Sequence, residues 1–219
     1  MSQILIAYQS YDGQSERIAN VMAETIKILG HEPVLRNLAD KVATKVEWKA
    51  YRGVILGGPI HRGVHAQCVQ TFVKTNLEML NRIPTAFFSV SLSAAGNDSQ
   101  KDDAQRCLEE FLDDAGLNAV DTIIVAGALK YRKYGFFKRL MMRWIARRAG
   151  SSDLDTSQDY EYTNWQRVTA FVERFVSTIG LKSFGAIEPV DRNQSQVHQP
   201  WGACHDQAKI DTLSARFFR

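Results

Sequence analysis

The sequence predicts an α/β domain with five parallel strands and helices on both faces of the sheet. Short apolar runs, rich in β-branched residues, alternate along the chain with longer amphipathic segments. Turns that contain Gly or Pro separate these segments. Strands that are joined through helices pair in parallel, and because the crossovers are right-handed, the helices divide between the two faces. A chain of 219 residues with 45% hydrophobic residues is long enough to bury one substantial core.

The first three predicted strands are short and end at turns. QILIAY at residues 3–8 is a β-branched apolar run, and EPVLRNL at residues 32–38 is a more exposed strand. Between them lies a predicted helix at residues 15–30, which ends at a glycine. Its inward face consists of Ile18, Val21, Met22, Thr25, Ile26 and Leu29. RGVILGGPI at residues 52–60 is a buried strand that stops at Gly-Gly-Pro.

The alternation continues in the second half of the chain. A helix is predicted over about residues 65–80, and PTAFFSVSL at residues 84–92 forms the fourth strand. A helix at residues 100–115 and a fifth strand at residues 121–129 follow. The last amphipathic helix, at residues 163–180, begins with a threonine as its cap and ends at a glycine.

Cysteine content and hydropathy predict a protein of a reducing compartment. The three cysteines are few and widely spaced, which argues against a disulfide framework. The N-terminus lacks the basic and apolar regions of a signal peptide, and no segment approaches the roughly 18 apolar residues of a spanning helix. We therefore expect a protein that is soluble or bound to a membrane surface from the cytoplasm.

The positive charge is concentrated in one segment, residues 130–148. This segment contains eight Lys and Arg residues and no acid, which leaves 19 cations against 24 acids elsewhere. Within it, KRLMMRWIARR at residues 138–148 places an apolar stripe between cations at helical spacing. The stripe consists of Phe137, Leu140, Met141, Trp144 and Ile145. An anionic membrane surface is the favoured partner, ahead of docking on the domain or a second subunit; nucleic acid is disfavoured because the rest of the chain is acidic.

The turn SYDGQS at residues 10–15 is a candidate anion site. It joins a strand to a helix at the sheet edge where ligands of open parallel sheets bind. Hydroxyls, a glycine and a helix N-terminus together favour a phosphate. The turn lacks the Walker pattern and the dinucleotide pattern GxGxxG. A purely structural turn, with Ser15 as the N-cap of the helix, remains the alternative at this point.

Two further loops follow strands at the same predicted edge. GGPIHRG at residues 57–63 and SLSAAGND at residues 91–98 are longer and richer in small residues than simple connections need. Three such loops can form a cradle for a flat ring, which points to a mononucleotide with a ring system.

The chain resembles flavodoxin-like proteins, and more closely the menaquinone-dependent protoporphyrinogen IX dehydrogenase family. The motifs that carry this resemblance are YDGQS at residues 11–15, TAFFSVSL at 85–92, AGALKYRKY at 126–134 and YTNW at 162–165. The third is the most specific, because ordinary flavodoxins are acidic in that region. The resemblance covers roughly residues 1–180 and implies a sheet with strand order 2-1-3-4-5.

The family resemblance also implies the cofactor, the substrates and the site. It implies FMN-dependent oxidation of protoporphyrinogen IX, with electrons passed to menaquinone or ubiquinone. The residues expected around the FMN phosphate are Ser10, Tyr11, Asp12, Gly13, Gln14 and Ser15. Those expected near the ring are Ile60, His61, Leu92, Ser93 and Ala94. The loops at residues 59–64 and 92–98 lack the aromatic residues that often sandwich the flavin, so Tyr131 and Tyr134 are candidates for that role.

These inferences combine into one prediction of organisation and location. Residues 1–180 form an FMN-binding domain with a basic membrane and substrate insert at 130–160, and residues 181–219 form a largely disordered tail. The protein is expected in the cytoplasm, peripheral on the inner face of the cell membrane; a homo-oligomer is left open. No metal site is predicted, because His198, Cys204 and His205 have irregular spacing and no fourth partner.

No catalytic base is assigned from the sequence. His61 is the best-placed titratable residue, with a structural or ring-contact role as the more favoured alternative. Two other function classes stay open: a flavodoxin-like NAD(P)H:quinone reductase or electron carrier, and a non-catalytic membrane-binding module.

Overall fold

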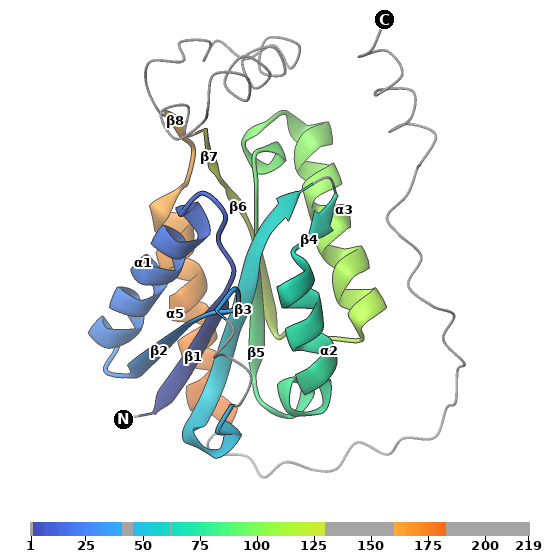
Figure 1. Cartoon of the computed structure of the whole chain (residues 1–219). Helices are drawn as coiled ribbons and strands as arrows, with labels where there is room; N and C mark the ends of the chain where they lie inside the picture. Colours follow the sequence, from blue (N-terminus) through green and yellow to red (C-terminus); the bar gives the residue numbers. More distant parts are fainter. Residues whose placement is uncertain (1, 41–45, 62, 130–159, 183–219) are drawn as a thin grey trace, which may run out of the picture.

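The computed structural model describes residues 2–40, 46–61, 63–129 and 160–182. At its centre lies a sheet of five parallel strands (Figure 1). The strands are β1 (Gln3–Tyr8), β2 (Glu32–Asn37), β3 (Tyr51–His61), β5 (Thr85–Ser91) and β6 (Asp121–Ala126). Their spatial order is β2-β1-β3-β5-β6, which is the predicted order 2-1-3-4-5 when the parallel strands alone are counted.

A short strand that the sequence analysis did not predict pairs with the end of β3. β4 (Val64–His65) runs antiparallel to β3, with Ile60 opposite His65 and His61 opposite Val64. The Gly-Gly-Pro sequence does not stop β3, because this hairpin continues its pairing to His61.

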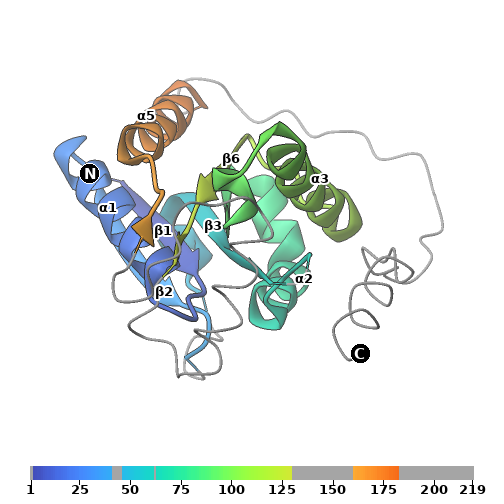
Figure 2. The same cartoon turned by 90° about the horizontal axis from the view of Figure 1, so that it is seen from above.

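Two helices cover each face of the sheet, as Figures 1 and 2 show. One face is covered by α1 (Gln14–Ile28) and α5 (Trp165–Lys182). The other is covered by α2 (Gln67–Arg82) and α3 (Asp98–Ala115). Two 3-10 turns, η1 (Trp48–Ala50) and η2 (Ser93–Ala95), lie in the connections. The predicted layers are therefore confirmed, with helix boundaries shifted by up to two residues.

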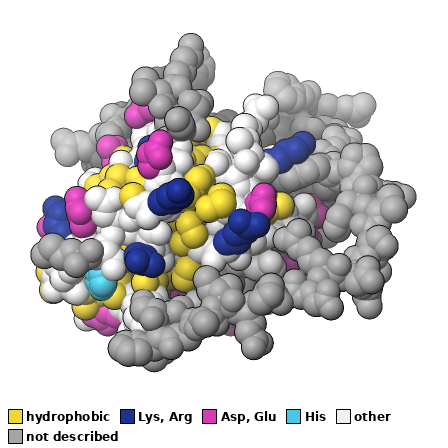
Figure 3. Space-filling model, turned by 90° about the horizontal axis from the view of Figure 1, so that it is seen from below, with side chains coloured by type: hydrophobic (Ala, Val, Ile, Leu, Met, Phe, Trp, Pro, Cys, Tyr) yellow, Lys and Arg dark blue, Asp and Glu magenta, His cyan; other side chains and the backbone are white. Residues whose placement is uncertain are grey.

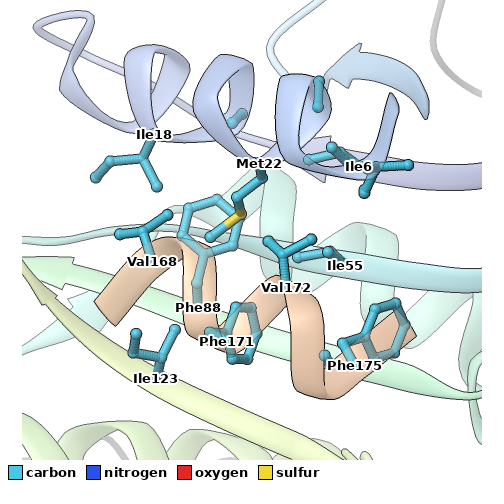
Figure 4. Packing of buried hydrophobic residues seen from close by; sticks show 14 of the residues in the cluster. Ile6, Ile18, Met22, Ile55, Phe88, Ile123, Val168, Phe171, Val172 and Phe175 are labelled. Carbon is cyan, nitrogen blue, oxygen red and sulfur yellow. The ribbon is translucent and has the colours of Figure 1, made fainter. Parts of the chain in front are cut away.

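The core beneath α1 and α5 is built from aromatic and β-branched side chains (Figure 4). Met22 from α1, Phe88 from β5 and Phe171 from α5 are all completely buried. A Cβ atom at Gly53 of β3 would collide with Cδ1 of Ile179 in α5, so a larger residue there would require the Ile179 side chain to move. This packing fixes α1, and with it the turn that precedes α1, against the sheet.

The end of the fifth predicted strand leaves the sheet. Predicted residues 121–129 divide at Gly127 into β6 and β7 (Ala128–Leu129). β7 pairs antiparallel with β8 (Tyr160–Glu161), with Ala128 opposite Glu161. Figure 1 shows this hairpin above the carboxyl end of the main sheet, and Figure 2 shows β8 beside α1.

The capping of α5 differs from the prediction. The helix begins after Asn164, whose side-chain oxygen accepts a hydrogen bond from Arg167 N at 3.0 Å. Thr163 is not the cap, because its hydroxyl donates to the carbonyl oxygen of Ala126 at 2.7 Å. Gly180 does not end the helix, which continues to Lys182.

Several predictions fall outside the described residues. The basic helix at 138–148, Tyr131, Tyr134 and the tail from 183 onward belong to this group. Figure 3 shows the end of the molecule at which the parallel strands begin, where hydrophobic, basic and acidic side chains are mixed. Within the described ranges no helix combines the length and the apolar character that crossing a membrane requires.

Candidate functional site

The three loops expected to form the cradle come together at the carboxyl ends of β1, β3 and β5. These strands are neighbours in the sheet, so the residues that follow them meet at one edge. A direct contact joins the first two loops: the rings of Tyr11 and His61 pack edge to face with centroids 4.7 Å apart. This contact links His61 to the turn after β1, and its expected place near the flavin ring stays a prediction.

The turn after β1 presents the N-terminus of α1 without a side-chain cap. Gly13 is the N-cap residue, with a positive φ of 82° that favours glycine. Helix α1 begins at Gln14, and its first backbone hydrogen bond runs from Arg17 N to Gly13 O at 3.1 Å. Ser15 lies inside the first turn and is buried, so the alternative in which Ser15 caps the helix is wrong. The uncapped N–H groups and the helix dipole favour an anion here.

Three buried polar atoms in this turn have no hydrogen bond partner among the described residues. They are Gln9 Oε1, Ser10 Oγ and Gln14 Oε1. Buried polar atoms are rarely left unpaired, since each costs about 1–3 kcal/mol. The Ser10 hydroxyl can donate to an anion, whereas an amide carbonyl oxygen can only accept. The turn therefore suits a ligand that combines an anionic group with hydroxyl donors.

The third loop forms a tight turn after β5. The backbone N of Ala94 donates to Ser91 Oγ at 3.2 Å, and η2 places Ser93 and Ala94 in one 3-10 turn. Leu92 is exposed, as is Tyr11 across the edge with 59% of its surface accessible. Ile60, one residue before the end of β3, is partly buried. Exposed apolar groups around a polar turn are compatible with a flat aromatic ligand.

Gln14 also belongs to a hydrogen-bonded network that the sequence analysis missed. Its amide nitrogen donates to Glu161 Oε1 at 2.8 Å and to Thr163 Oγ1 at 3.0 Å. Arg17 Nη1 lies 2.8 Å from both oxygens of the Glu161 carboxylate, and its guanidinium stacks over Trp165. The YTNW motif at 162–165 signalled this region, but the partners are 144–149 residues apart and no local pattern connects them.

Titratable groups near the edge are held neutral by burial. Burial lowers the pKa of His65 to about 4, and its ring packs against those of Phe87 and Phe111. Burial also raises the pKa of the Tyr8 phenol, and the negative charges of Glu16 and Asp40 act in the same direction. Within the described ranges, no group of three His, Cys, Asp or Glu side chains is placed to hold a metal ion.

Comparison with known proteins decides the family. A family model described as a flavodoxin domain matches residues 5–155. Protoporphyrinogen IX dehydrogenase [quinone] of Escherichia coli K12 is 30% identical over 167 residues, which cover 76% of this chain and 91% of that one. The chain belongs to the flavodoxin-like protoporphyrinogen IX dehydrogenase family. A relative of the same name from Leishmania major is 27% identical over 174 residues, 79% of this chain and 74% of its own.

Solved structures confirm the fold of this family member. Oxidised flavodoxin 2 of Bacillus cereus superposes with a TM-score of 0.50 at 20% identity, over 81% of this chain and 99% of its own. Rubredoxin oxygen:oxidoreductase of Desulfovibrio gigas has a TM-score of 0.51 at 12% identity; 84% of this chain matches 38% of that longer protein. The flavodoxin domain implies a flavin cofactor, and family membership makes the chain a flavin oxidoreductase.

Proposed function

We propose that the protein oxidises protoporphyrinogen IX to protoporphyrin IX with FMN as cofactor, and passes the electrons to a membrane quinone, menaquinone or ubiquinone. The observation that carries this proposal is the match to the E. coli protoporphyrinogen IX dehydrogenase [quinone], which extends over 91% of that protein. The uncapped turn at residues 9–14, with its buried unpaired atoms, supports a phosphorylated cofactor at the expected edge.

The residues of this chain fit FMN. The Ser10 hydroxyl and the backbone N–H groups from Gly13 to Ser15 would hold the phosphate, with Tyr11, Asp12 and Gln14 in the same turn. The ring would lie against Ile60, His61, Leu92, Ser93 and Ala94. FMN, when bound, supplies two-electron oxidation of the macrocycle and reduction of the quinone; loss of six electrons and six protons aromatises one protoporphyrinogen.

The proposed division of the chain gives the basic segment a separate task. Residues 1–180 form the FMN-binding domain, and its insert at 130–160 brings the flavin site to an anionic membrane surface where quinone dissolves. Each cation near such a surface contributes roughly 1 kcal/mol. Arginines there can also pair with the propionates of the macrocycle. The protein is accordingly placed in the cytoplasm, peripheral on the inner face of the cell membrane.

Vesicle binding tests the membrane part of the proposal. We expect the protein to sediment with anionic vesicles, and the triple variant Arg139→Glu, Arg143→Glu, Arg147→Glu to remain in the supernatant. A matched control variant replaces three exposed cations of the described residues with Glu, at Lys49, Arg82 and Lys101, and should sediment as the wild-type protein does. Equal sedimentation of the wild-type protein and the first variant would refute a membrane role for the segment.

The decisive test of the activity is anaerobic. FMN-loaded protein is mixed with protoporphyrinogen IX, with and without a menaquinone analogue, and porphyrin fluorescence is followed against a protein-free control. Porphyrin that forms faster only with both protein and quinone would support substrate, acceptor and cofactor together. Flavin-loaded protein without this activity would leave a quinone reductase or an electron carrier. Reduction of the bound flavin by NADPH would identify the reductase. Protein that takes up no FMN would leave the non-catalytic membrane-binding module.

A further inference from the structure

The network around Gln14 joins three separate parts of the fold. Gln14 is the first residue of α1, Glu161 lies on β8, and Thr163 precedes α5. Gln14 and Thr163 are both more than nine-tenths buried, so the hydrogen bond between them is shielded from water. The network therefore determines the conformation of a side chain inside the turn at residues 9–14, the cofactor turn.

The hydrogen-bonding pattern fixes the orientation of the Gln14 amide. Thr163 has one hydroxyl proton, which it donates to Ala126 O at 2.7 Å, so toward Gln14 it can only accept. The Glu161 carboxylate likewise accepts. Both neighbours thus require the NH₂ group of Gln14 on their side, and two independent partners agree on this orientation.

Glu161 itself is held firmly in place. Arg17 contacts both carboxylate oxygens at 2.8 Å, and its guanidinium lies 4.9 Å from the centre of the Trp165 ring. The backbone of Glu161 pairs with Ala128 across the β7–β8 hairpin. The side chain of Glu161 is 32% exposed, so the ion pair contributes little to stability, and its role is one of position.

The consequence lies at the other end of the amide. Gln14 Oε1 is buried and has no partner among the described residues. Because its orientation is fixed, this atom cannot donate, and a phosphate dianion, which only accepts, is no partner for it. A hydroxyl group is the donor that a phosphorylated polyol offers next to its phosphate.

We infer that Glu161 and Thr163 are positioning residues for the cofactor turn, and that they fix the Gln14 carbonyl oxygen to accept a hydrogen bond from a hydroxyl of the FMN polyol chain. This inference rests on the proposed function, since it takes FMN as the ligand. It assigns a positioning role to two residues that lie outside the cofactor turn. It also separates Gln14 from the phosphate, around which the sequence analysis grouped it.

Flavin titrations of the full chain test the inference. Dissociation constants for FMN and for riboflavin are measured by flavin fluorescence in the wild-type protein and in Glu161→Ala, Glu161→Gln and Gln14→Ala. Loss of a buried hydrogen bond predicts affinity about fivefold to tenfold weaker in Glu161→Ala, equally for both flavins. Glu161→Gln should restore most of the affinity, because its carbonyl oxygen can accept from Gln14. Glu24→Ala, which removes an exposed ion pair with Lys27 on the same helix, should bind as the wild type does.

The double variant separates positioning from general damage. In a Gln14→Ala background the effect of Glu161→Ala should vanish, because Glu161 acts through Gln14. Removal of the Glu161 charge alone would strengthen binding of an anion, so a loss of affinity cannot arise from charge.

Three outcomes would overturn the inference. One is unchanged affinity in Glu161→Ala, another is a loss that persists in the Gln14→Ala background, and the third is a loss confined to FMN, which would place Gln14 at the phosphate. Failure of the wild-type protein to bind FMN would overturn the proposed function as well. If the wild-type protein binds FMN and all variants bind it with the same affinity, this inference alone is overturned.

Discussion

The hydroxyl of Ser10 is a buried donor for which the described part of the chain supplies no acceptor. Such an atom lowers the stability of the protein without its ligand and raises its affinity for a ligand that completes the hydrogen bond. The side-chain oxygens of Gln9 and Gln14 are unpaired acceptors, and a ligand that donates to them has the same effect on affinity. At the scale of single residues, three of the five buried unpaired side-chain atoms in the described part of the chain thus lie in the candidate turn.

Ser10→Ala should separate ligand affinity from stability. Removal of an unpaired hydroxyl leaves the free energy of unfolding of the flavin-free protein unchanged or raises it by up to about 1 kcal/mol. The affinity for FMN should fall about tenfold or more, since a hydrogen bond to a charged phosphate is lost. Urea unfolding and flavin titration measure the two quantities.

Thr85→Val is the matched control for this variant. The Thr85 hydroxyl donates a hydrogen bond to Leu80 O at 2.7 Å. Thr85 lies at the opposite end of the sheet from the site. We expect a loss of about 1–2 kcal/mol in stability and no change in flavin affinity. A stability loss in Ser10→Ala as large as in Thr85→Val would show that Ser10 has a structural partner.

His65 should make the stability of the protein pH-dependent. Its pKa in the folded state, about 4, lies below the value of 6.5 in the unfolded chain, because the charged ring would be buried against Phe87 and Phe111. The contribution of neutral His65 to stability is therefore fully present above pH 6.5 and is lost as the pH falls toward 4. At pH 5 the loss from this residue amounts to about 2 kcal/mol.

His65→Phe removes the titration and keeps an aromatic ring in the same place. Between pH 7 and pH 5 the wild-type protein should lose about 2 kcal/mol more unfolding free energy than the variant does. Urea unfolding at both pH values measures it, whatever the absolute stability of the variant. A difference that stays constant with pH would contradict the buried, neutral state of His65.

At the scale of elements, hydrophobic periodicity predicted the framework and local polar chemistry determined its ends. The apolar faces of α1, α2 and α5 were visible in sequence because each packs on one side of the sheet. The start of α5 was not, since Thr163 and Asn164 are both good capping residues and the choice depends on a distant carbonyl group, that of Ala126. Likewise, Gly180 could not be recognised as helical from its neighbours alone.

Asn164→Ala should destabilise α5 at its first turn. The side-chain oxygen of Asn164 accepts from Arg167 N, and loss of such a cap costs about 1 kcal/mol. The expected result is a lower urea midpoint with an unchanged dependence on denaturant. The same substitution at Asn97, the cap of α3, serves as the reference because its capping box is complete. An unaltered midpoint in Asn164→Ala, with a lowered one in Asn97→Ala, would contradict the assignment of the α5 cap.

At the scale of the whole molecule, the cofactor turn depends on both ends of the described fold. The turn follows the first strand, and its polar network is completed by residues from β8 and the start of α5. The position of the site at the sheet edge followed from the alternation of strands and helices. Its closing contacts did not, because hydrogen bonds across 147–149 residues depend on tertiary packing that no sequence pattern records.

The dependence on α5 predicts where the chain can be shortened. The two buried clusters are formed by residues between Ile4 and Ile179, and α5 ends at Lys182. A chain truncated after Lys182 should therefore unfold within about 2 °C of the full-length protein and bind FMN with equal affinity. Truncation after Ala170 removes Phe171 and Phe175 from the core, and each such loss costs about 3–5 kcal/mol, so this shorter chain should not fold. Calorimetry and flavin titration of both chains measure this, and a large loss in the longer one would show that residues 183–219 belong to the folded domain.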